Sequence, residues 1–222
     1  AYILNGTRSL ATVDISNPLD PIQTSIKYDE FKDFQYNPPS VINLTYPLFI
    51  TISNNHLYIM NGNGLEVMDI SNPAQPKHIT NLVDSLGLKK IFYGPRAISK
   101  SGNYIFILNS NPQYHLYKSG FTGITVLDVS NPTHPTHISS LLDDENGERL
   151  IGAMSMARSG NYLYVYCQDQ EFLIYGVDKP YWNFIKVIDA SDPYKLKVIG
   201  NVDVSNLPGN ELVGGSLYTE KN

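Results

Sequence analysis

The sequence predicts an all-β protein, a β-propeller built of four-stranded antiparallel blades. Two observations predict this class. A short sequence motif, VDISNP at 13–18, occurs four times in similar form at nearly even spacing, and the predicted strands are apolar on both faces. A third observation excludes helical classes, because no stretch of useful length shows the 3.6-residue period of an amphipathic helix. We expect about four blades within the 222 residues, as part of a larger ring.

The repeated phrase begins at an aspartate, and successive aspartates lie 55, 59 and 61 residues apart. Asp and Ser side chains accept or share hydrogen bonds with backbone groups two residues on, and the residue before a proline avoids the helical conformation. We interpret each phrase as the turn between the third and fourth strands of a blade. A calcium site would need six or more oxygens, so the aspartates are structural turn clamps rather than metal ligands. The clamps are Asp14, Asp69, Asp128 and Asp189.

Four strands follow one another in each repeat. First strands are expected at 48–53, 96–101, 152–159 and 211–216, and Tyr-rich second strands at 57–60, 104–108 and 162–166. Third strands end at the repeated aspartates, and fourth strands are expected at 22–26, 77–83, 136–142 and 196–202. The turns between first and second strands carry Asn or Gly, which tolerate positive φ.

The third strand has apolar residues at successive positions, which point to opposite faces of a sheet. A sheet with one solvated face should alternate apolar and polar residues, so these sheets should be covered on both sides. We therefore expect six third-strand residues to be nearly solvent-free: Val67, Met68, Val126, Leu127, Val187 and Ile188.

The repeats divide one propeller domain, 1–222, into blades. The first blade spans 1–27 and holds the second to fourth strands, and 210–222 is a closing strand or the start of a next blade. That last segment could complete the first blade of a four-bladed ring, but its second-strand start and the absence of an initiating Met favour a piece of a larger ring. Open blade edges would then favour self-association. The other blades are 47–83, 96–142 and 152–203.

The combination of GNYLYVY at 160–166 with the phrases at 64–76 and 122–135 resembles the LVIVD-repeat family of β-propellers, over essentially the whole chain. Members of that family are mostly bacterial or archaeal, often exported or surface-attached, and mostly of undefined activity. The resemblance implies an extracellular, cell-surface or periplasmic location, and it supplies no common catalytic residues. The fourth repeat departs from the pattern at Ala190, Asp192 and Leu196.

Charge and composition exclude several classes of function. The net charge is −5 and the basic residues are scattered, which argues against nucleic acid as a partner. No apolar run is long enough for a transmembrane helix. His78 and His137 occupy the same position in fourth strands of different blades, so they should not share an ion, and Cys167 has no Cys or His partner nearby in sequence. No metal, cofactor or catalytic residue is predicted.

Long connections are expected on one face of the propeller, at 27–47, 84–95, 109–122, 143–151 and 167–184. Long loops on a rigid scaffold commonly carry binding sites, and aromatic residues concentrate in sugar and protein interfaces. This face is the predicted site for a glycan or protein partner. The aromatic anchors are Tyr117, Tyr175, Tyr181 and Trp182, and the polar contacts are Arg96 and His115.

The sequence favours a non-catalytic binding or scaffold module of an exported or surface-associated protein. The alternative is a propeller enzyme, such as a hydrolase, lyase or metal-dependent oxidase, with its site at the channel mouth. Enzymatic activity is left open, because propellers host many functions. Convergence of several polar loop residues would favour the enzyme: His115, Asp143, Asp144, Glu148, Asp178 and Arg96.

Overall fold

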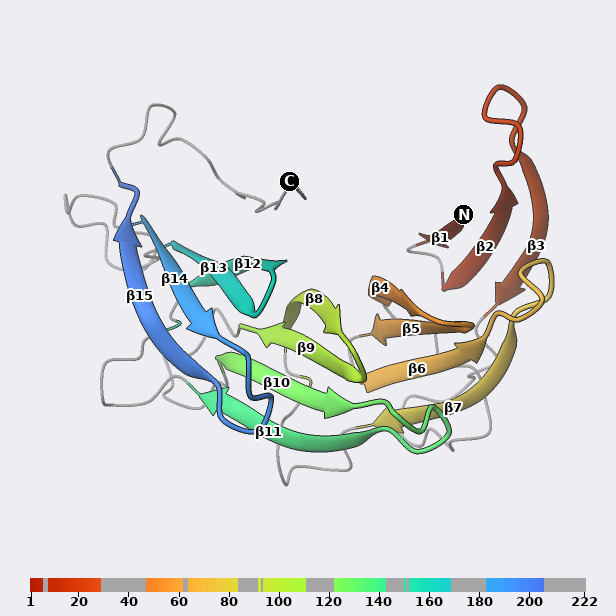
Figure 1. Cartoon of the computed structure of the whole chain (residues 1–222). Coiled ribbons are helices and arrows are strands. Elements are labelled where there is room, and N and C mark those ends of the chain that lie inside the picture. Colours follow the sequence, from red (N-terminus) through yellow and green to blue (C-terminus); the bar gives the residue numbers. More distant parts are fainter. Residues whose placement is uncertain are drawn as a thin grey trace. The chain divides into compact units, whose positions relative to one another are not determined.

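The computed structural model describes residues 1–5, 8–28, 47–61, 64–83, 92, 94–110, 122–142, 150, 152–168 and 183–205. Within these ranges the regular elements are fifteen β-strands, shown in Figure 1. No helix in this part of the chain is long and apolar enough to cross a membrane. The predicted all-β class is confirmed.

The strands form four antiparallel sheets in which neighbours in sequence are neighbours in space. The first sheet has three strands, β1 (Tyr2–Asn5), β2 (Ser9–Asp14) and β3 (Ile22–Tyr28). The second has β4 (Pro47–Ser53), β5 (His56–Asn61), β6 (Gly64–Asp69) and β7 (Lys77–Val83). The third has β8 (Pro95–Ser101), β9 (Tyr104–Asn109), β10 (Gly123–Asp128) and β11 (Thr136–Leu142). The fourth has β12 (Ala153–Ser159), β13 (Tyr162–Gln168), β14 (Asn183–Asp189) and β15 (Lys197–Asp203).

This sequential order is the blade pattern of a β-propeller, so the predicted architecture is also confirmed. Most strands begin and end within a residue of their predicted limits, although β3 and β13 each continue two residues beyond the predicted end, to Tyr28 and Gln168. The expected strand at 211–216, and the whole segment 210–222, lie outside the described residues.

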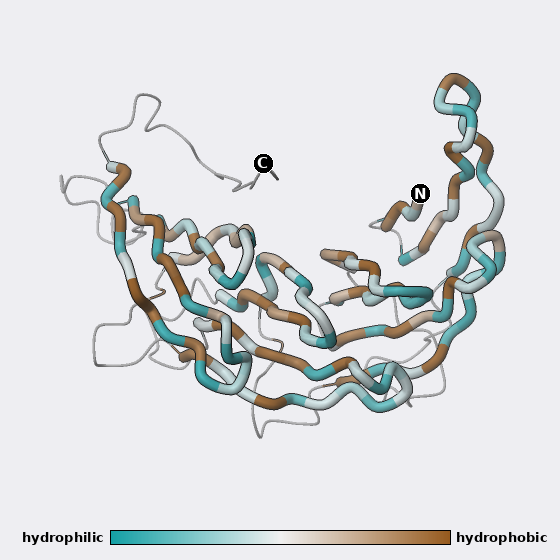
Figure 2. The backbone as a smooth tube through the Cα atoms, viewed as in Figure 1, coloured by the Kyte–Doolittle hydropathy of each residue, from teal (hydrophilic) through white to brown (hydrophobic). Residues whose placement is uncertain are grey.

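The chain divides into two compact units. The first comprises Ala1–Phe92 with Val129–Thr136, and the second comprises Tyr93–Asp128 with His137–Asn222. Each unit has its own hydrophobic core, and Figure 2 shows hydrophobic residues along the strands of all four sheets. In the first unit the core includes a cluster of Leu10, Leu57, Ile59 and Met68, against which Tyr2, Leu4, Ile50 and Ile70 pack. In the second unit it includes Phe106, Leu108, Val126, Leu163, Val165 and Ile188.

The third strands of the two middle sheets are buried on both faces. In β6 and β10 the side chains of Val67, Met68, Val126 and Leu127 are 0% exposed, as predicted. The prediction is wrong for Val187 in β14, which is only half-buried, whereas Ile188 is 0% exposed. Val187 pairs with Gly200 of β15, and a glycine provides no side chain to cover its neighbour.

Two local features recur between blades and position the sites below. The first residue of the turn between first and second strands has a left-handed φ, 51° at Asn54, 54° at Gly102 and 55° at Gly160, which these residue types tolerate. The fourth strand carries an extra, bulged residue opposite the third strand. The bulged residues are Thr24 in β3, Ile79 in β7 and Ile199 in β15.

Candidate functional site

The repeated phrase folds into a turn in which the aspartate accepts a hydrogen bond from the backbone N–H of the serine two residues later. The Oδ1 of Asp69 accepts from Ser71 at 2.7 Å. The same bond joins Asp14 to Ser16 at 2.9 Å and Asp189 to Ser191 at 2.9 Å. Asp128 ends β10 at the equivalent position, and its clamp role stays a prediction.

A second bond of the same kind follows within each turn, because the residue before the proline accepts from the backbone N–H two residues on. This acceptor is the side-chain oxygen Oδ1 of an Asn in three repeats and of Asp192 in the fourth, where the distance to the Tyr194 nitrogen is 2.9 Å. The distances in the other repeats are 3.2 Å for Asn17 to Leu19, 3.2 Å for Asn72 to Ala74 and 3.1 Å for Asn131 to Thr133. The turns are therefore internally bonded and need no cation to hold their shape.

The serine also sets the electrostatics of the aspartates. Hydrogen bonds from the Ser71 backbone N–H and from the Ser71 hydroxyl stabilise the ionised carboxylate, so the pKa of Asp69 lies below its ordinary value. Ser16 and Ser191 lower the pKa of Asp14 and of Asp189 in the same way. These carboxylates are solvent-exposed, and their bonding is local.

Five of the six predicted ligand-contact residues, Tyr117, Tyr175, Tyr181, Trp182 and His115, lie outside the described residues. The sixth, Arg96, is the bulged second residue of β8 and directly follows the predicted loop 84–95. Its side chain is partly buried, and its Nε atom is buried with no hydrogen-bond partner among the residues that the structure describes. Of the polar loop residues whose convergence would favour an enzyme, only Arg96 is described.

Two polar pairs lie inside the sheets. In the second sheet the Nε2 of His78 is 3.2 Å from the Oε1 of Glu66, whose side chain is 0% exposed. In the third sheet the Nδ2 of Asn109 donates to the Oγ1 of Thr125 at 3.0 Å, and both residues are 0% exposed. Sequence reasoning missed Glu66, although a carboxylate in the middle of an otherwise apolar third strand was a visible signal.

The described histidines are engaged with nearby side chains. The Nδ1 of His134 lies 2.8 Å from the Thr133 hydroxyl, and the Nε2 of His137 lies 2.8 Å from the Ser140 hydroxyl. In the part of the chain that the structure describes, no three His, Cys, Asp or Glu residues are grouped to hold a metal ion. Cys167 is 3% exposed and packs in the core of the second unit.

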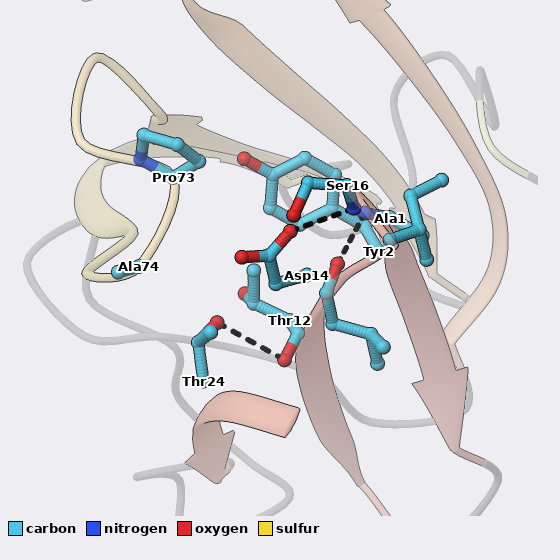
Figure 3. Close-up of a pocket in the computed structure, with 10 residues that line it drawn as sticks. Ala1, Tyr2, Thr12, Asp14, Ser16, Thr24, Pro73 and Ala74 are labelled. Carbon is cyan, nitrogen blue, oxygen red and sulfur yellow. Dashed lines mark hydrogen bonds between the residues drawn. The ribbon is translucent and has the colours of Figure 1, made fainter. Parts of the chain in front are cut away.

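A cavity of about 310 Å³ lies in the first unit, where the first sheet meets the turn after β6. Figure 3 shows Tyr2, Thr12 and Asp14 on one side of it and Pro73 and Ala74 on the other. Its remaining lining residues are Ala1, Val13, Ile15, Ser16 and Thr24.

Some polar groups that line this cavity have hydrogen-bond partners and one does not. The Thr24 hydroxyl donates to the backbone carbonyl of Thr12 at 3.3 Å, and Asp14 accepts from Ser16 through Oδ1. Thr12 is only 3% exposed, and its buried hydroxyl has no hydrogen-bond partner in the described structure. Sequence reasoning did not select Thr12 or Thr24, and a position-by-position comparison of the four repeats would have done so.

The arrangement of blades and turns agrees with a comparison to known families. The family model of the LVIVD repeat matches residues 1–27, 49–83, 119–143 and 152–178, just over half of the chain. The chain belongs to the LVIVD repeat family. The matched segments cover strands of all four sheets, so the resemblance inferred from the repeated phrases is confirmed.

Similar solved structures are longer than this LVIVD repeat chain. One is the crystal structure of a functionally unknown protein from Desulfotomaculum acetoxidans DSM 771, with 17% identity, a TM-score of 0.56, and coverage of 95% of this chain and 54% of that one. Another is the N-terminal domain of Nup159, with 11% identity, a TM-score of 0.45, and coverage of 90% of this chain and 40% of that one. The chain spans about half the length, or less, of these structures. No curated protein matches its sequence.

Proposed function

We propose that this LVIVD repeat chain is a non-catalytic binding module that presents an aromatic-rich loop face to a glycan or protein partner. Locked turns and sheets buried on both faces make the blades a rigid support, which is the usual context for binding loops. The proposal includes an exported or surface-associated location, which protease accessibility on intact cells would test.

The observation that carries the proposal is the state of Arg96. A β-bulge redirects a side chain, and here it falls where the loop 84–95 enters β8. Arg96 remains partly exposed, and its buried Nε atom has no hydrogen-bond partner among the described residues. Guanidinium groups bind carboxylates through paired hydrogen bonds, and aromatic residues of the loops would supply stacking surfaces for a sugar or a side chain. The favoured partner therefore carries a carboxylate, as an acidic sugar or an acidic side chain does.

The test compares Arg96→Ala with Leu48→Ala on an array of acidic and neutral glycans, and on a series of acidic peptides. Leu48 is the matched control because it is the bulged residue at the equivalent place in β4 and is 46% exposed. We expect carboxylate-bearing ligands to be lost by Arg96→Ala and by Trp182→Ala, and kept by Leu48→Ala, with unchanged thermal midpoints. An array on which no ligand responds to Arg96 or Trp182 would contradict the proposal, and turnover of a bound glycan would favour an enzyme instead.

A further inference from the structure

The fourth blade carries a second aspartate–serine clamp, at the end of its fourth strand. The Oδ1 atom of Asp203, the last residue of β15, accepts a hydrogen bond from the backbone N–H of Ser205 at 2.9 Å. Asp189 and Ser191 make the same bond in the tight turn after β14. Asp203 lies fourteen positions after Asp189, where the other repeats have the apolar residues Tyr28, Val83 and Leu142. Among the four repeats, only the fourth has this second clamp.

The Ser205 side chain also reaches the start of the neighbouring strand. Its Oγ atom accepts a hydrogen bond from the backbone N–H of Asn183, the first residue of β14, at 2.8 Å. The Asn183 carbonyl accepts from the backbone N–H of Val204 at 2.8 Å, which continues the pairing of β14 with β15 by one step. These two strands are neighbours in the fourth sheet (Figure 1). Both backbone groups of Asn183 are therefore held, and a side chain holds one of them.

The single hydroxyl proton of Ser205 has two acceptors within reach. One is the Asn183 carbonyl at 3.5 Å, the limit of a hydrogen bond, and the other is the Asp203 carboxylate. An ionised carboxylate is the stronger acceptor, and the Ser205 hydroxyl is the largest cause that holds the pKa of Asp203 below its ordinary value. The bonds therefore run in one direction, from the Asn183 N–H to the Ser205 oxygen and from the Ser205 hydroxyl to Asp203.

The start of β14 also differs from the corresponding strands of the other blades. Phe184 stands where the other third strands have Ser9, Gly64 and Gly123. In the second and third sheets a side chain does not fit there, because an added Cβ would meet the backbone carbonyl of Leu82 or Leu141 on the fourth strand. This end of the fourth sheet is therefore built differently from the same end of the second and third sheets.

The bond from Asn183 to Ser205 is next to an aromatic anchor in the sequence. Trp182 is the residue before Asn183. A peptide unit is planar, and the unit that contains the Asn183 N–H also contains the Trp182 carbonyl and its Cα. A hydrogen bond to that N–H therefore orients the backbone from which the indole projects. A side chain that is oriented before binding loses less conformational freedom when a ligand arrives.

We propose that Ser205 and Asp203 are positioning residues for Trp182, an anchor of the loop face. This role rests on the proposed function and deepens it, because the partner then meets an indole that is already held in place. Ser205 holds the peptide unit next to Trp182. Asp203 holds Ser205 in the orientation that accepts from Asn183.

Trp182 is the single tryptophan of the chain, so its fluorescence tests this role without any ligand. We expect Ser205→Ala and Asp203→Ala to lower the fluorescence anisotropy and to raise the quenching constant for acrylamide. Ser205→Thr keeps the hydroxyl and should retain both values. Ser191→Ala is the matched control, because it removes the corresponding hydroxyl from the tight turn of the same blade, and it should also change neither value. Thermal midpoints identify any variant that fails to fold.

The arrays of acidic glycans and acidic peptides separate this role from the proposed function. A ligand that Trp182→Ala loses should bind Ser205→Ala about fivefold more weakly, the cost of ordering one side chain on binding, and should bind Ser191→Ala unchanged. Altered fluorescence in Ser205→Ala without any array ligand would support the positioning of Trp182 and contradict the proposed function. Unaltered fluorescence in Ser205→Ala, or an equal change in Ser191→Ala, would overturn the positioning role whatever the arrays show.

Discussion

The Nε2 atom of His78 lies 3.2 Å from the Oε1 atom of Glu66, inside the second sheet. The Glu66 side chain is wholly enclosed, and the His78 side chain is 11% exposed. Glu66 belongs to the third strand, β6, and His78 to the fourth strand, β7, so the pair links the edge strand of the blade to its neighbour. The other repeats have Ala11, Thr125 and Lys186 at the position of Glu66.

Removal of the imidazole should destabilise this blade. We expect His78→Ala to lower the free energy of unfolding by about 3 kcal/mol, because it takes a close partner from an enclosed carboxylate. His137→Ala is the matched control at the same position of the next fourth strand. There the Nε2 atom of the imidazole lies 2.8 Å from the Ser140 hydroxyl, a neutral partner, and the change should cost about 1 kcal/mol. Urea denaturation measures both. The double change Glu66→Leu with His78→Phe should recover most of the loss, and a double variant as unstable as His78→Ala would contradict this view.

The clamp turns should make the protein sensitive to acid. The pKa of Asp14, Asp69 and Asp189 is lowered in the folded chain, chiefly by the backbone N–H of the following serine. Their contribution to stability is therefore complete above the unfolded pKa, about 3.9, and is lost as the pH falls through the lower folded values. The urea midpoint should drop between pH 6 and pH 3. The midpoint of Asp69→Asn should drop less over this range than that of the unaltered chain, because the amide does not titrate.

Two equivalent serines should respond in opposite ways. Ser139 donates to the Pro193 carbonyl at 2.6 Å, so Ser139→Ala should cost about 1 kcal/mol of unfolding free energy. Ser25 has a buried hydroxyl with no partner in the described structure, so Ser25→Ala should be neutral or stabilising. Chemical denaturation of the two single variants makes the comparison, and an equal loss in both would show that Ser25 has a bonding role.

Glycine is required more strictly before β12 than in the hairpin turns. At Gly152 the φ is 71° and an added Cβ would meet the backbone of Gln168, whereas at Gly102 the φ is 54° and an added Cβ would meet nothing within 4 Å. Gly102→Ala should cost about 1 kcal/mol, the penalty of the left-handed conformation alone. Gly152→Ala should cost clearly more, about 3 kcal/mol, because the backbone must also shift. Similar thermal midpoints for the two variants would contradict the steric argument.

The fold was accessible from the sequence because its determinants are local. The Asp–Ser bond and the turn around the proline form within six consecutive residues, and the apolar pattern of the third strand is read directly. The exposure of Val187 was not accessible, since it depends on Gly200, which lies on another strand.

The sites were harder to predict for the same reason. The Thr12 cavity depends on Ala74, 62 positions away in the chain, so only the folded arrangement of two blades brings its walls together. The aromatic loop residues remain predictions. An alignment of the four repeats shows that Thr12 and Thr24 replace the Val and Ile of the other three. The sequence alone does not show that both residues line one cavity.

The strictly sequential order of strands has a consequence for how the molecule forms during synthesis. Every described strand pairs with the strand immediately before or after it, so each sheet grows by adding successive hairpins and needs no segment from elsewhere in the chain. Loop closure over such short separations is rapid, and repeat architectures fold by extension from units already formed. A blade such as β4–β7 can therefore assemble as soon as its residues leave the ribosome, while the next blade is still being translated. Ribosome-stalled chains in which a linker long enough to fill the exit tunnel follows Val83 should already protect the amides of β5 and β6 from hydrogen exchange.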